Sequence, residues 1–515
     1  MSRPASRAGS ILGDGSSIRS YMPSSAILGD GESIFGGGLA DRHNGFDASA
    51  DMLQEHIDTV TAHHDDASLD FDQEFEDISE LEDEDEAQRL WRAKRKHFLI
   101  LSAAGKPIYT RHGSDGTISN YIGILQTIIS TYKSWDTDLK TFTTDRVSFV
   151  VLAQTNLFLV AISALPESEA QVRGQLEALY TQILSTLTLP QLTHIFSVRP
   201  SADLRRPLQG TEVLLSALAD SFTRGSPSTL LQALESLRIR KSHRQVIHST
   251  MLQARTDKLL YGLIVAGGRL VSVIRPKKHS LHPGDLHLIV NMLFEAEGIK
   301  AGGGESFIPV CLPGFNNTGF LHMYVSFLDA LDEGVRELDM DEKVAKEDTL
   351  AIILLSASKD SFDDLRSMKR YLVYELRRSG CMRVIHKAVQ NNRPLATDIV
   401  PGTVLQHFLY KSKGNVQFFM PSYSPHFEDA QARRHLYSIY HKLHGAAHAK
   451  YAAVKVQHIV TTTTSALAWV TPMFELYCVA GPATPRNALA QNANKVVQWI
   501  QREEERIFLI GGAVF

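Results

Sequence analysis

The succession of apolar patterns in residues 96–187 constrains the fold more closely than any other feature of the sequence. Two apolar runs flank a turn at Gly105, Lys106 and Pro107, which predicts a β-hairpin. Apolar residues at helical spacing then predict a helix at 118–135, whose first turn Ser119 can support. Three strands at 140–143, 147–153 and 157–164 and a long helix at 168–187 should follow. The order ββαβββα indicates an α/β fold of the α+β type.

A similar order recurs further along the chain, which at 515 residues is too long for one core. A second unit is expected from a hairpin at 259–275 around Gly267 and Gly268, a helix at 283–297, and strands at 306–312 and 320–327. A third is expected from a strand at 349–356, a helix at 362–378, strands at 416–420, 454–461 and 474–480, and a closing helix at 492–505. The predicted domains are therefore 95–205, 206–345 with a helical lead-in, and 346–515.

The N-terminal part of the chain differs in composition from everything that follows. Residues 41–90 carry 18 acidic and two basic side chains, a net charge of -16, whereas the remainder after residue 90 has a net charge of +12. Few aromatic residues and a nearly continuous charged run predict that 1–94 is a disordered acidic regulatory tail. The tail could shield the basic body until an anionic partner displaces it, or it could simply aid solubility.

A short sequence occurs twice within this tail. ILGDGSSI at 11–18 recurs as ILGDGESI at 27–34, and two copies are too few for a repeat fold. The pair could be a duplicated docking peptide that is switched by phosphorylation of Ser17 or Ser33. Chance duplication in a low-complexity segment explains it equally well.

The motifs of enzymes and of cofactor-binding proteins are missing from the sequence. It lacks the phosphate-binding GxxxxGK[ST] loop, a GxSxG elbow and HExxH, and its glycine clusters lack the strand-to-helix setting of a dinucleotide site. We therefore expect no catalytic residue, no cofactor and no covalent chemistry. Three separated cysteines and the lack of an apolar leader favour a cytoplasmic protein. No apolar run predicts a membrane span.

Two groups of polar residues leave a choice between a site and ordinary solvation. His441, His444 and His448 share one face of a predicted helix and could bind a metal, but the ligand set is incomplete, so we favour a solvated face and expect no metal. Arg275, Lys277 and Lys278 could bind a lipid headgroup or be a solvated loop. No basic run interleaved with aromatics predicts nucleic-acid binding.

Several long segments resemble the Mon family of vacuolar fusion proteins, named for monensin sensitivity. They are KHFLILSAAGKPIYTRHG (96–113), QLTHIFSVRPSADLRR (191–206), HPGDLHLIVN (282–291), FIPVCLPGFNNTGFLHMYVSFL (307–328), HFLYKSK (407–413), LAWVTPMFELYC (467–478) and WIQREEERIFLI (499–510). The resemblance runs in order from about residue 95 to the C-terminus. The first 90 residues lie outside it.

The resemblance implies three longin domains, each a five-stranded antiparallel sheet flanked by helices. It also implies a heterodimer with a Ccz subunit, formed through the first longin domain, that exchanges guanine nucleotide on a late endosomal or vacuolar Rab GTPase. An early endosomal Rab could recruit the complex, and acidic or phosphoinositide lipids could hold it peripherally on late endosomes, multivesicular bodies and vacuoles or lysosomes. Such a protein would promote endosome maturation, vacuole fusion, autophagy and vacuolar protein transport.

The predicted helix at 118–135 is our candidate for binding the GTPase or the partner subunit. Five polar or aromatic residues on it and on the next strand form the candidate set: Asn120, Gln126, Lys133, Trp135 and Lys140. Tryptophan is a common interface anchor, although Trp135 could instead close the core end of the helix. A noncatalytic scaffold that links a Rab, a phosphoinositide lipid and the fusion machinery would have the same sequence features.

Overall fold

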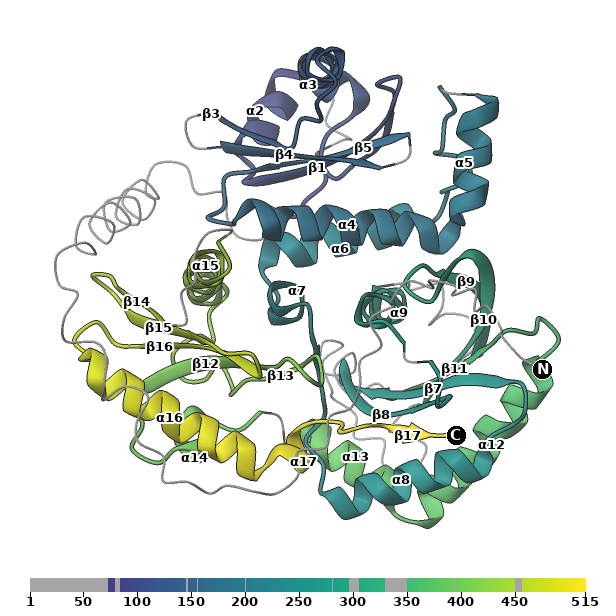
Figure 1. Cartoon of the computed structure of the whole chain (residues 1–515), viewed down its shortest axis with the longest axis vertical. Helices are drawn as coiled ribbons and strands as arrows, with labels where there is room; N and C mark the ends of the chain where they lie inside the picture. The colour runs from purple at the N-terminus through teal and green to yellow at the C-terminus, as the bar shows by residue number, and fades with distance from the viewer. Residues whose placement is uncertain are drawn as a thin grey trace, which may run out of the picture. The chain divides into compact units, whose positions relative to one another are not determined.

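The computed structural model describes residues 73–78, 84–144, 147–154, 156–199, 201–279, 281–295, 305–328, 350–391, 393–449 and 456–515. Within these residues the chain forms three antiparallel sheets with helices on both faces (Figure 1). No helix in the described ranges is both long and apolar enough to cross a membrane. The predicted α+β fold class and the presence of three sheet-containing units are confirmed.

The first sheet has the predicted ββαβββα order. Its elements are β1 (Lys96–Ser102), β2 (Pro107–Thr110), α3 (Asp115–Ser134), β3 (Thr141–Thr144), β4 (Val147–Gln154), β5 (Leu157–Ser163) and α4 (Glu169–Thr186). The strands lie in the order β2-β1-β5-β4-β3. Gly105 takes a positive φ of 78° in the β1–β2 turn, where glycine is favoured. Ser168 and Gln171 form a capping box that starts α4.

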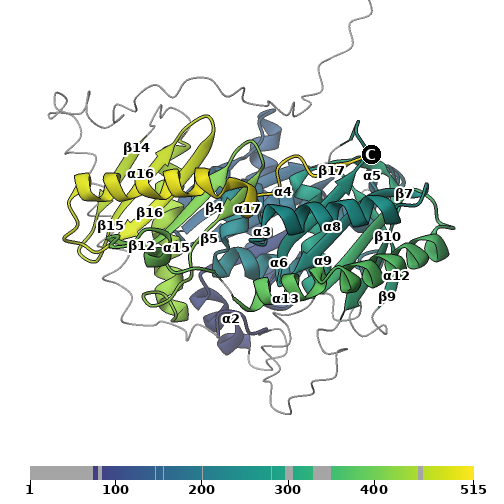
Figure 2. The same ribbon diagram turned by 90° about the horizontal axis from the view of Figure 1, so that it is seen from below.

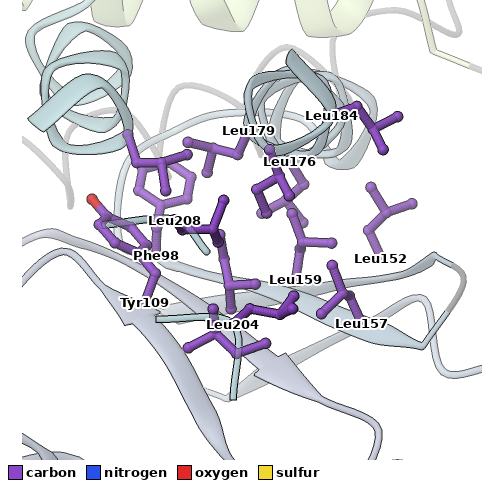
Figure 3. Close-up of a cluster of buried hydrophobic side chains, with 14 of the residues drawn as sticks. Phe98, Tyr109, Leu152, Leu157, Leu159, Leu176, Leu179, Leu184, Leu204 and Leu208 are labelled. Carbon is purple, nitrogen blue, oxygen red and sulfur yellow. The ribbon is translucent and has the colours of Figure 1, made fainter. Parts of the chain in front are cut away.

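Alternation along β1 explains how one strand supports two cores. Phe98 and Ile100 point to the face covered by α4 and pack with Leu176 and Leu179 (Figure 3). Leu99 and Leu101 point to the opposite face and pack with Ile118 and Leu125 of α3. Because successive strand side chains face opposite ways, a strand whose side chains are all buried must lie between helices on both sides.

The same order of elements is repeated twice more. The second domain consists of β7 (Leu259–Ala266), β8 (Arg269–Arg275), α9 (Pro283–Glu295), β9 (Glu305–Leu312), β10 (Asn316–Leu328), β11 (Leu350–Ser356) and α12 (Phe362–Arg378). The third consists of β12 (Leu405–Ser412), β13 (Gln417–Phe419), α15 (Ala430–Ala447), β14 (Val456–Val460), β15 (Ser465–Val470), β16 (Phe474–Ala480) and α16 (Arg486–Arg502). In each sheet the fifth strand pairs with the first and the fourth, as in the first domain.

The predicted boundary between 345 and 346 is wrong. The strand expected to open the third domain is β11, which pairs with β7 and β10 in the middle of the second sheet. The helix after it, α12, packs into the same second-domain core through Leu365 and Leu372. The third domain begins with β12. Figure 2 shows α8 (Lys241–Ala254) and α12 over the second sheet and α16 over the third.

The helices after α4 also depart from the predicted division at residue 205. They are α5 (Leu189–Val198), α6 (Glu212–Arg224) and α7 (Pro227–Leu231). Leu215, Ala219 and Phe222 of α6 belong to the first core, so this part of the expected lead-in covers the first sheet instead. The last helix of the lead-in, α8, does pack in the core of the second domain. Leu230 and Leu231 of α7 belong to the core of the third domain.

The second and third sheets each gain a sixth strand from outside their own run of sequence. The short strand β6 (Leu234–Glu235), which precedes the second domain, pairs in parallel with β13 of the third. The strand β17 (Ala513–Val514), which follows the third domain, pairs in parallel with β8 of the second. Three short helices complete the described structure: α13 (Cys381–Gln390), α14 (Ala396–Ile399) and α17 (Glu504–Ile507). This reciprocal exchange should make the two domains unfold together.

A buried glutamine joins the two exchanged segments. The side-chain oxygen of Gln417 accepts hydrogen bonds from the Leu509 N–H, at 2.8 Å, and from the Ser236 hydroxyl. Its amide nitrogen donates to the Leu509 carbonyl at 3.0 Å. We expect Gln417→Leu to lower the free energy of unfolding by about 2–4 kcal/mol, because two buried backbone groups lose their partner. Urea denaturation checks this, with Gln431→Leu, an exposed glutamine on α15, as the matched control.

The acidic tail ends earlier than predicted. Residues 73–78 are placed on the body, and α2 (Glu84–Ala93) follows them. Ile78 and Trp91 are buried in the core between α3 and the first sheet. The expectation of a disordered segment reaching residue 94 is therefore wrong for these residues, because their apolar side chains enter that core. Ser17, Ser33 and the duplicated peptide lie outside the described residues.

Candidate partner-binding surface

Helix α3 has a buried face and an exposed face that is also partly apolar. Ile118, Ile122, Leu125 and Ile129 face the sheet and are buried. A second row of side chains points outward, and it comprises Ile124 (61% exposed), Tyr132 (38%) and Trp135 (65%), the last just beyond the helix end. Removing side chains of this size from water would stabilise a complex, so this row is the strongest candidate contact surface on the first domain.

Small residues lie beside this apolar row. An open shallow groove on α3 is lined by Gly123, Gln126, Thr127, Ser130, Thr131 and Ser134. Short side chains let a second backbone approach closely, and their hydroxyls already donate within the helix, as Thr127 does to the Gly123 carbonyl at 2.8 Å. The groove and the apolar row together can accept a helix or a loop of another protein.

The neighbouring strand β3 adds an edge. β3 is an edge strand of the first sheet. Within the described residues its backbone is hydrogen-bonded to β4 on one side and to no strand on the other. Phe142 stacks on Phe149 of β4, with ring centroids 4.5 Å apart, which holds the edge in place. An edge strand with open backbone groups can pair with a strand of a partner.

The predicted candidates lie on or near this surface to different degrees. Trp135 packs edgewise on Tyr132, with ring centroids 5.5 Å apart, and does not close the core. Lys133 is exposed, with its ammonium 4.7 Å from the centroid of the Phe158 ring, and Lys140 is exposed at the start of β3. Gln126 lies against the β1–β2 turn, where a Cβ on Gly105 would overlap its side-chain oxygen. The side chain of Asn120 lies outside the described residues.

Sequence reasoning missed two members of the surface. Tyr132 lies three residues after Ile129 and continues the helical spacing that predicts the buried face, yet it is 38% exposed. Ile124 was not singled out. The sequence does indicate its exposure, because Ile124 is an apolar residue that helical spacing places away from the buried face.

The candidate lipid-binding residues lie elsewhere, at the end of β8. Arg275 is half-buried, whereas Lys277 and Lys278 are exposed. The Lys277 N–H donates to the Phe515 carbonyl at 2.9 Å, and the Phe515 N–H donates to the Arg275 carbonyl at 3.1 Å. The β17 segment therefore holds the backbone of residues 275–277 in place, and the exposed side chains of Lys277 and Lys278 can bind an anionic surface.

The histidine face is not solvated, contrary to our expectation. His441 is buried near Glu167 and Lys96 of the first domain, and burial lowers its pKa. His444 is half-buried, and burial together with the neighbouring His448 lowers its pKa to about 3. Only His448 is exposed. Because α15 packs against the first domain, its histidines form part of a domain contact.

His444, His448 and Glu475 nevertheless have ligand atoms within 4.8 Å of one another. Their surroundings do not suit a metal. The Glu475 carboxylate already accepts from Tyr477, at 2.9 Å, and lies 3.3 Å from the Lys413 ammonium. Burial would raise the pKa of Glu475, but His448 and Lys411 lower it to about 2. A dication would have to displace these positive groups, so we assign a structural role.

Comparison with known proteins covers all three sheets. Family models match the first longin domain of FUZ, MON1 and HPS1 at residues 96–218, the second at 257–373 and the third at 404–504. The chain is 42% identical over 431 residues to the vacuolar fusion protein MON1 of Yarrowia lipolytica, covering 82% of this chain and 75% of that protein. It is 32% identical over 434 residues to the MON1 homolog A of Gallus gallus, with coverages of 84% and 75%. It is 31% identical over 432 residues to Protein SAND of Takifugu rubripes, with coverages of 84% and 79%.

Proposed function

The chain belongs to the MON1 family of vacuolar fusion proteins, and from this we propose that it acts in vacuolar fusion as one subunit of a guanine nucleotide exchange factor. Its partner is a Ccz subunit, and its substrate is a late endosomal or vacuolar Rab GTPase. The observation that carries the proposal is the exposed apolar row on α3 beside the open edge of β3. Endosome maturation, autophagy and vacuolar protein transport depend on the same activity.

The mechanism requires binding alone. An exchange factor accelerates GDP release when it binds the nucleotide-free GTPase more tightly than the loaded one, because only a difference in affinity can shift the equilibrium. No nucleophile, general base or cofactor is needed. We assign the α3 row and the β3 edge to the contact with the Ccz subunit and the GTPase.

A second candidate function is that of a membrane scaffold. The exposed lysines Lys277 and Lys278, on a backbone fixed by β17, favour contact with phosphoinositide or other acidic lipids. A scaffold would hold the Rab, the lipid and the fusion machinery together without accelerating exchange. Both functions place the protein peripherally on late endosomes, multivesicular bodies and vacuoles, and an early endosomal Rab could recruit it.

Capture of the GTPase in its different nucleotide states tests the proposal. We expect the heterodimer with the Ccz subunit to retain the late endosomal Rab after EDTA has stripped its nucleotide, and to release it when GDP or GTP with Mg²⁺ is added. Equal retention of the loaded and stripped forms would favour the scaffold.

Trp135 should be a major anchor of the complex. We expect Trp135→Ala to leave the thermal unfolding midpoint nearly unchanged, because the side chain is 65% exposed. Affinity for the Ccz subunit or the GTPase should fall by about thirtyfold, since truncation of an anchor costs about 2 kcal/mol or more. Titration calorimetry with each purified partner measures this. Met473→Ala is the matched control, since Met473 is 73% exposed on the third domain, and an equal loss in both variants would refute the assignment.

A further inference from the structure

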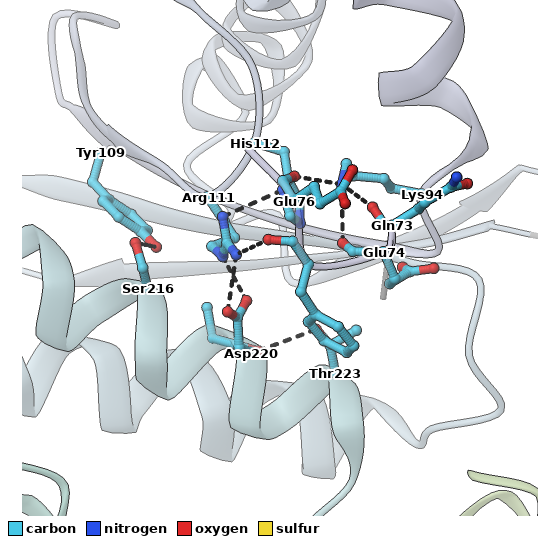
Figure 4. A network of polar contacts seen from close by, with 12 residues as sticks. Gln73, Glu74, Glu76, Lys94, Tyr109, Arg111, His112, Ser216, Asp220 and Thr223 are labelled. Carbon is cyan, nitrogen blue, oxygen red and sulfur yellow. Dashed lines mark hydrogen bonds and ion pairs between the residues drawn. The ribbon is translucent and has the colours of Figure 1, made fainter. Parts of the chain in front are cut away.

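Residues 73–78, at the end of the acidic segment, are wrapped around one buried lysine. The Lys94 ammonium donates to the carbonyls of Gln73 at 2.8 Å, Glu74 at 3.0 Å and Glu76 at 2.7 Å (Figure 4). An ammonium has three donors, so these carbonyls satisfy all of them. Lys94 is only 5% exposed, and removal of the segment would leave a buried cation without partners.

The carboxylate of Glu74 connects two domains. It is 2% exposed and accepts the Arg95 backbone N–H at 2.7 Å, directly before β1. On its other side it lies 3.7 Å from the Arg434 guanidinium, which belongs to α15 of the third domain. A buried carboxylate needs such partners, so its position is fixed by both domains at once.

The neighbouring residues secure the segment on both faces of the first sheet. The Phe75 carbonyl accepts from Arg111 at 2.7 Å, and the Phe75 ring lies 4.4 Å from the Arg224 guanidinium of α6. Arg111 also forms an ion pair with Asp220 of α6, as Figure 4 shows. On the opposite face, Ile78 lies in the core beneath α3.

Helix α15 has a second contact with the first domain. Gln171 lies at the start of α4, and its side-chain amide nitrogen is 3.0 Å from Nδ1 of His444 on α15. Arg434 and His444 are ten residues apart on α15, which corresponds to about 15 Å along a helix. Two contacts at this separation fix the direction of α15 relative to the first domain, whereas one contact would allow it to pivot.

We propose that residues 73–78 are a strap that fixes the first longin domain against α15. The helix α2, which follows in the sequence, contacts α3, because Trp91 packs at a tilt against Tyr121 with ring centroids 4.3 Å apart and Arg92 donates to the Tyr121 hydroxyl at 2.8 Å. This device is independent of the proposed exchange activity.

Hydrogen exchange on the full-length chain tests the strap. We expect Glu74→Ala to accelerate exchange at the Arg95 amide and in the first half of α15 by roughly tenfold or more, because a buried charge contact is lost. Glu76→Ala is the matched control: it removes the same charge two residues away, where the side chain is exposed. Its exchange rates should equal those of the unmodified chain.

Glu74→Gln distinguishes the two roles of the carboxylate and is the milder change. It keeps an acceptor for the Arg95 N–H but loses the attraction to Arg434, so we expect faster exchange in α15 with little change at Arg95. If Glu74→Ala and Glu76→Ala accelerate exchange equally, or if α15 keeps its protection in both Glu74 variants, residues 73–78 do not connect the two domains and the proposal is wrong.

Discussion

Lys96→Met is expected to lower the free energy of unfolding of the first domain by about 3–5 kcal/mol, since removing one partner of a buried ion pair leaves the other charge uncompensated. Lys96 forms a salt bridge with Glu167, and the two side chains are 0% and 1% exposed. Burial would raise the pKa of Glu167, but the Lys96 ammonium lowers it, so the carboxylate stays ionised. Gln175 completes the network, since it accepts from Lys96 at 2.6 Å and donates to Glu167 at 2.7 Å.

An exposed ion pair in the same domain provides the control. Lys106 and Asp203 lie 2.8 Å apart with side chains 46% and 39% exposed. Lys106→Met should therefore cost less than about 1 kcal/mol. Hydrogen exchange of the β1 and β5 amides measures both variants within this domain. If the two variants lose similar amounts of unfolding free energy, burial does not make the Lys96–Glu167 pair more costly to break. Partial recovery of stability in the double variant Lys96→Met/Glu167→Gln would support the role of burial.

Lowering the pH is expected to destabilise the protein already at pH values well above the range in which carboxylates titrate. Burial lowers the pKa of His97 to about 3 and of His407 to about 3, and burial with the charges of Arg111 and Lys94 lowers that of His112 to about 2. All three side chains are at most 4% exposed. Below pH about 6.5 the unfolded chain binds a proton at each histidine and the native chain does not, so stability falls as the pH falls.

The expected magnitude is large because the effects add. Each of these three histidines contributes about 1.4 kcal/mol per pH unit below its unfolded pKa, so together they should cost about 3–4 kcal/mol between pH 6 and pH 5. His248, His287 and His444, whose pKa values burial also lowers to about 4, 4 and 3, add to this cost. Urea denaturation at a series of pH values measures the slope. His407→Gln should lower the cost of the step from pH 6 to pH 5 by about 1 kcal/mol, whereas the exposed His194→Gln should leave it unchanged. A stability that is flat between pH 6.5 and 5 would show that these histidines are protonated in the native state.

Elements with strong local patterns could be predicted from the sequence. The strands β7, β8 and β16 and the helix α12 have the predicted bounds, because turn glycines or a clear helical period delimit them. The strands β12 and β15 were not predicted. Both are almost wholly buried, so neither shows the alternation that marks a strand with one solvated face. β15 is a nearly continuous apolar run, whereas β12 also contains Gln406, His407 and Lys411.

The domain boundary and the strap depend on contacts that are distant in sequence. The strand at 349–356 was expected to open a new domain, but β11 pairs with β7 and β10, from which it is separated in the sequence. Glu74 belongs to a segment whose composition is typical of disorder, but Lys94 and Arg434 provide its partners in the fold. Composition indicates the average tendency of a segment to be disordered, whereas the burial of one carboxylate depends on the residues that contact it in the fold.

The candidate surface was predicted in part for a related reason. Helical spacing correctly indicated the buried positions Ile118, Ile122, Leu125 and Ile129, but it also included the exposed Tyr132. Trp135 was expected to be an exposed anchor or a core residue. The sequence could not decide between these, because the residue lies just past the end of α3, where helical periodicity no longer applies.

Release of fluorescent GDP from a panel of purified Rab GTPases on liposomes, in the presence of this chain co-purified with its Ccz partner, tests the proposed exchange activity. We expect fast release that is confined to the late endosomal or vacuolar Rab and is strongly reduced by Trp135→Ala. No release from any Rab by a folded heterodimer would contradict the exchange-factor function and leave the membrane scaffold as the better explanation.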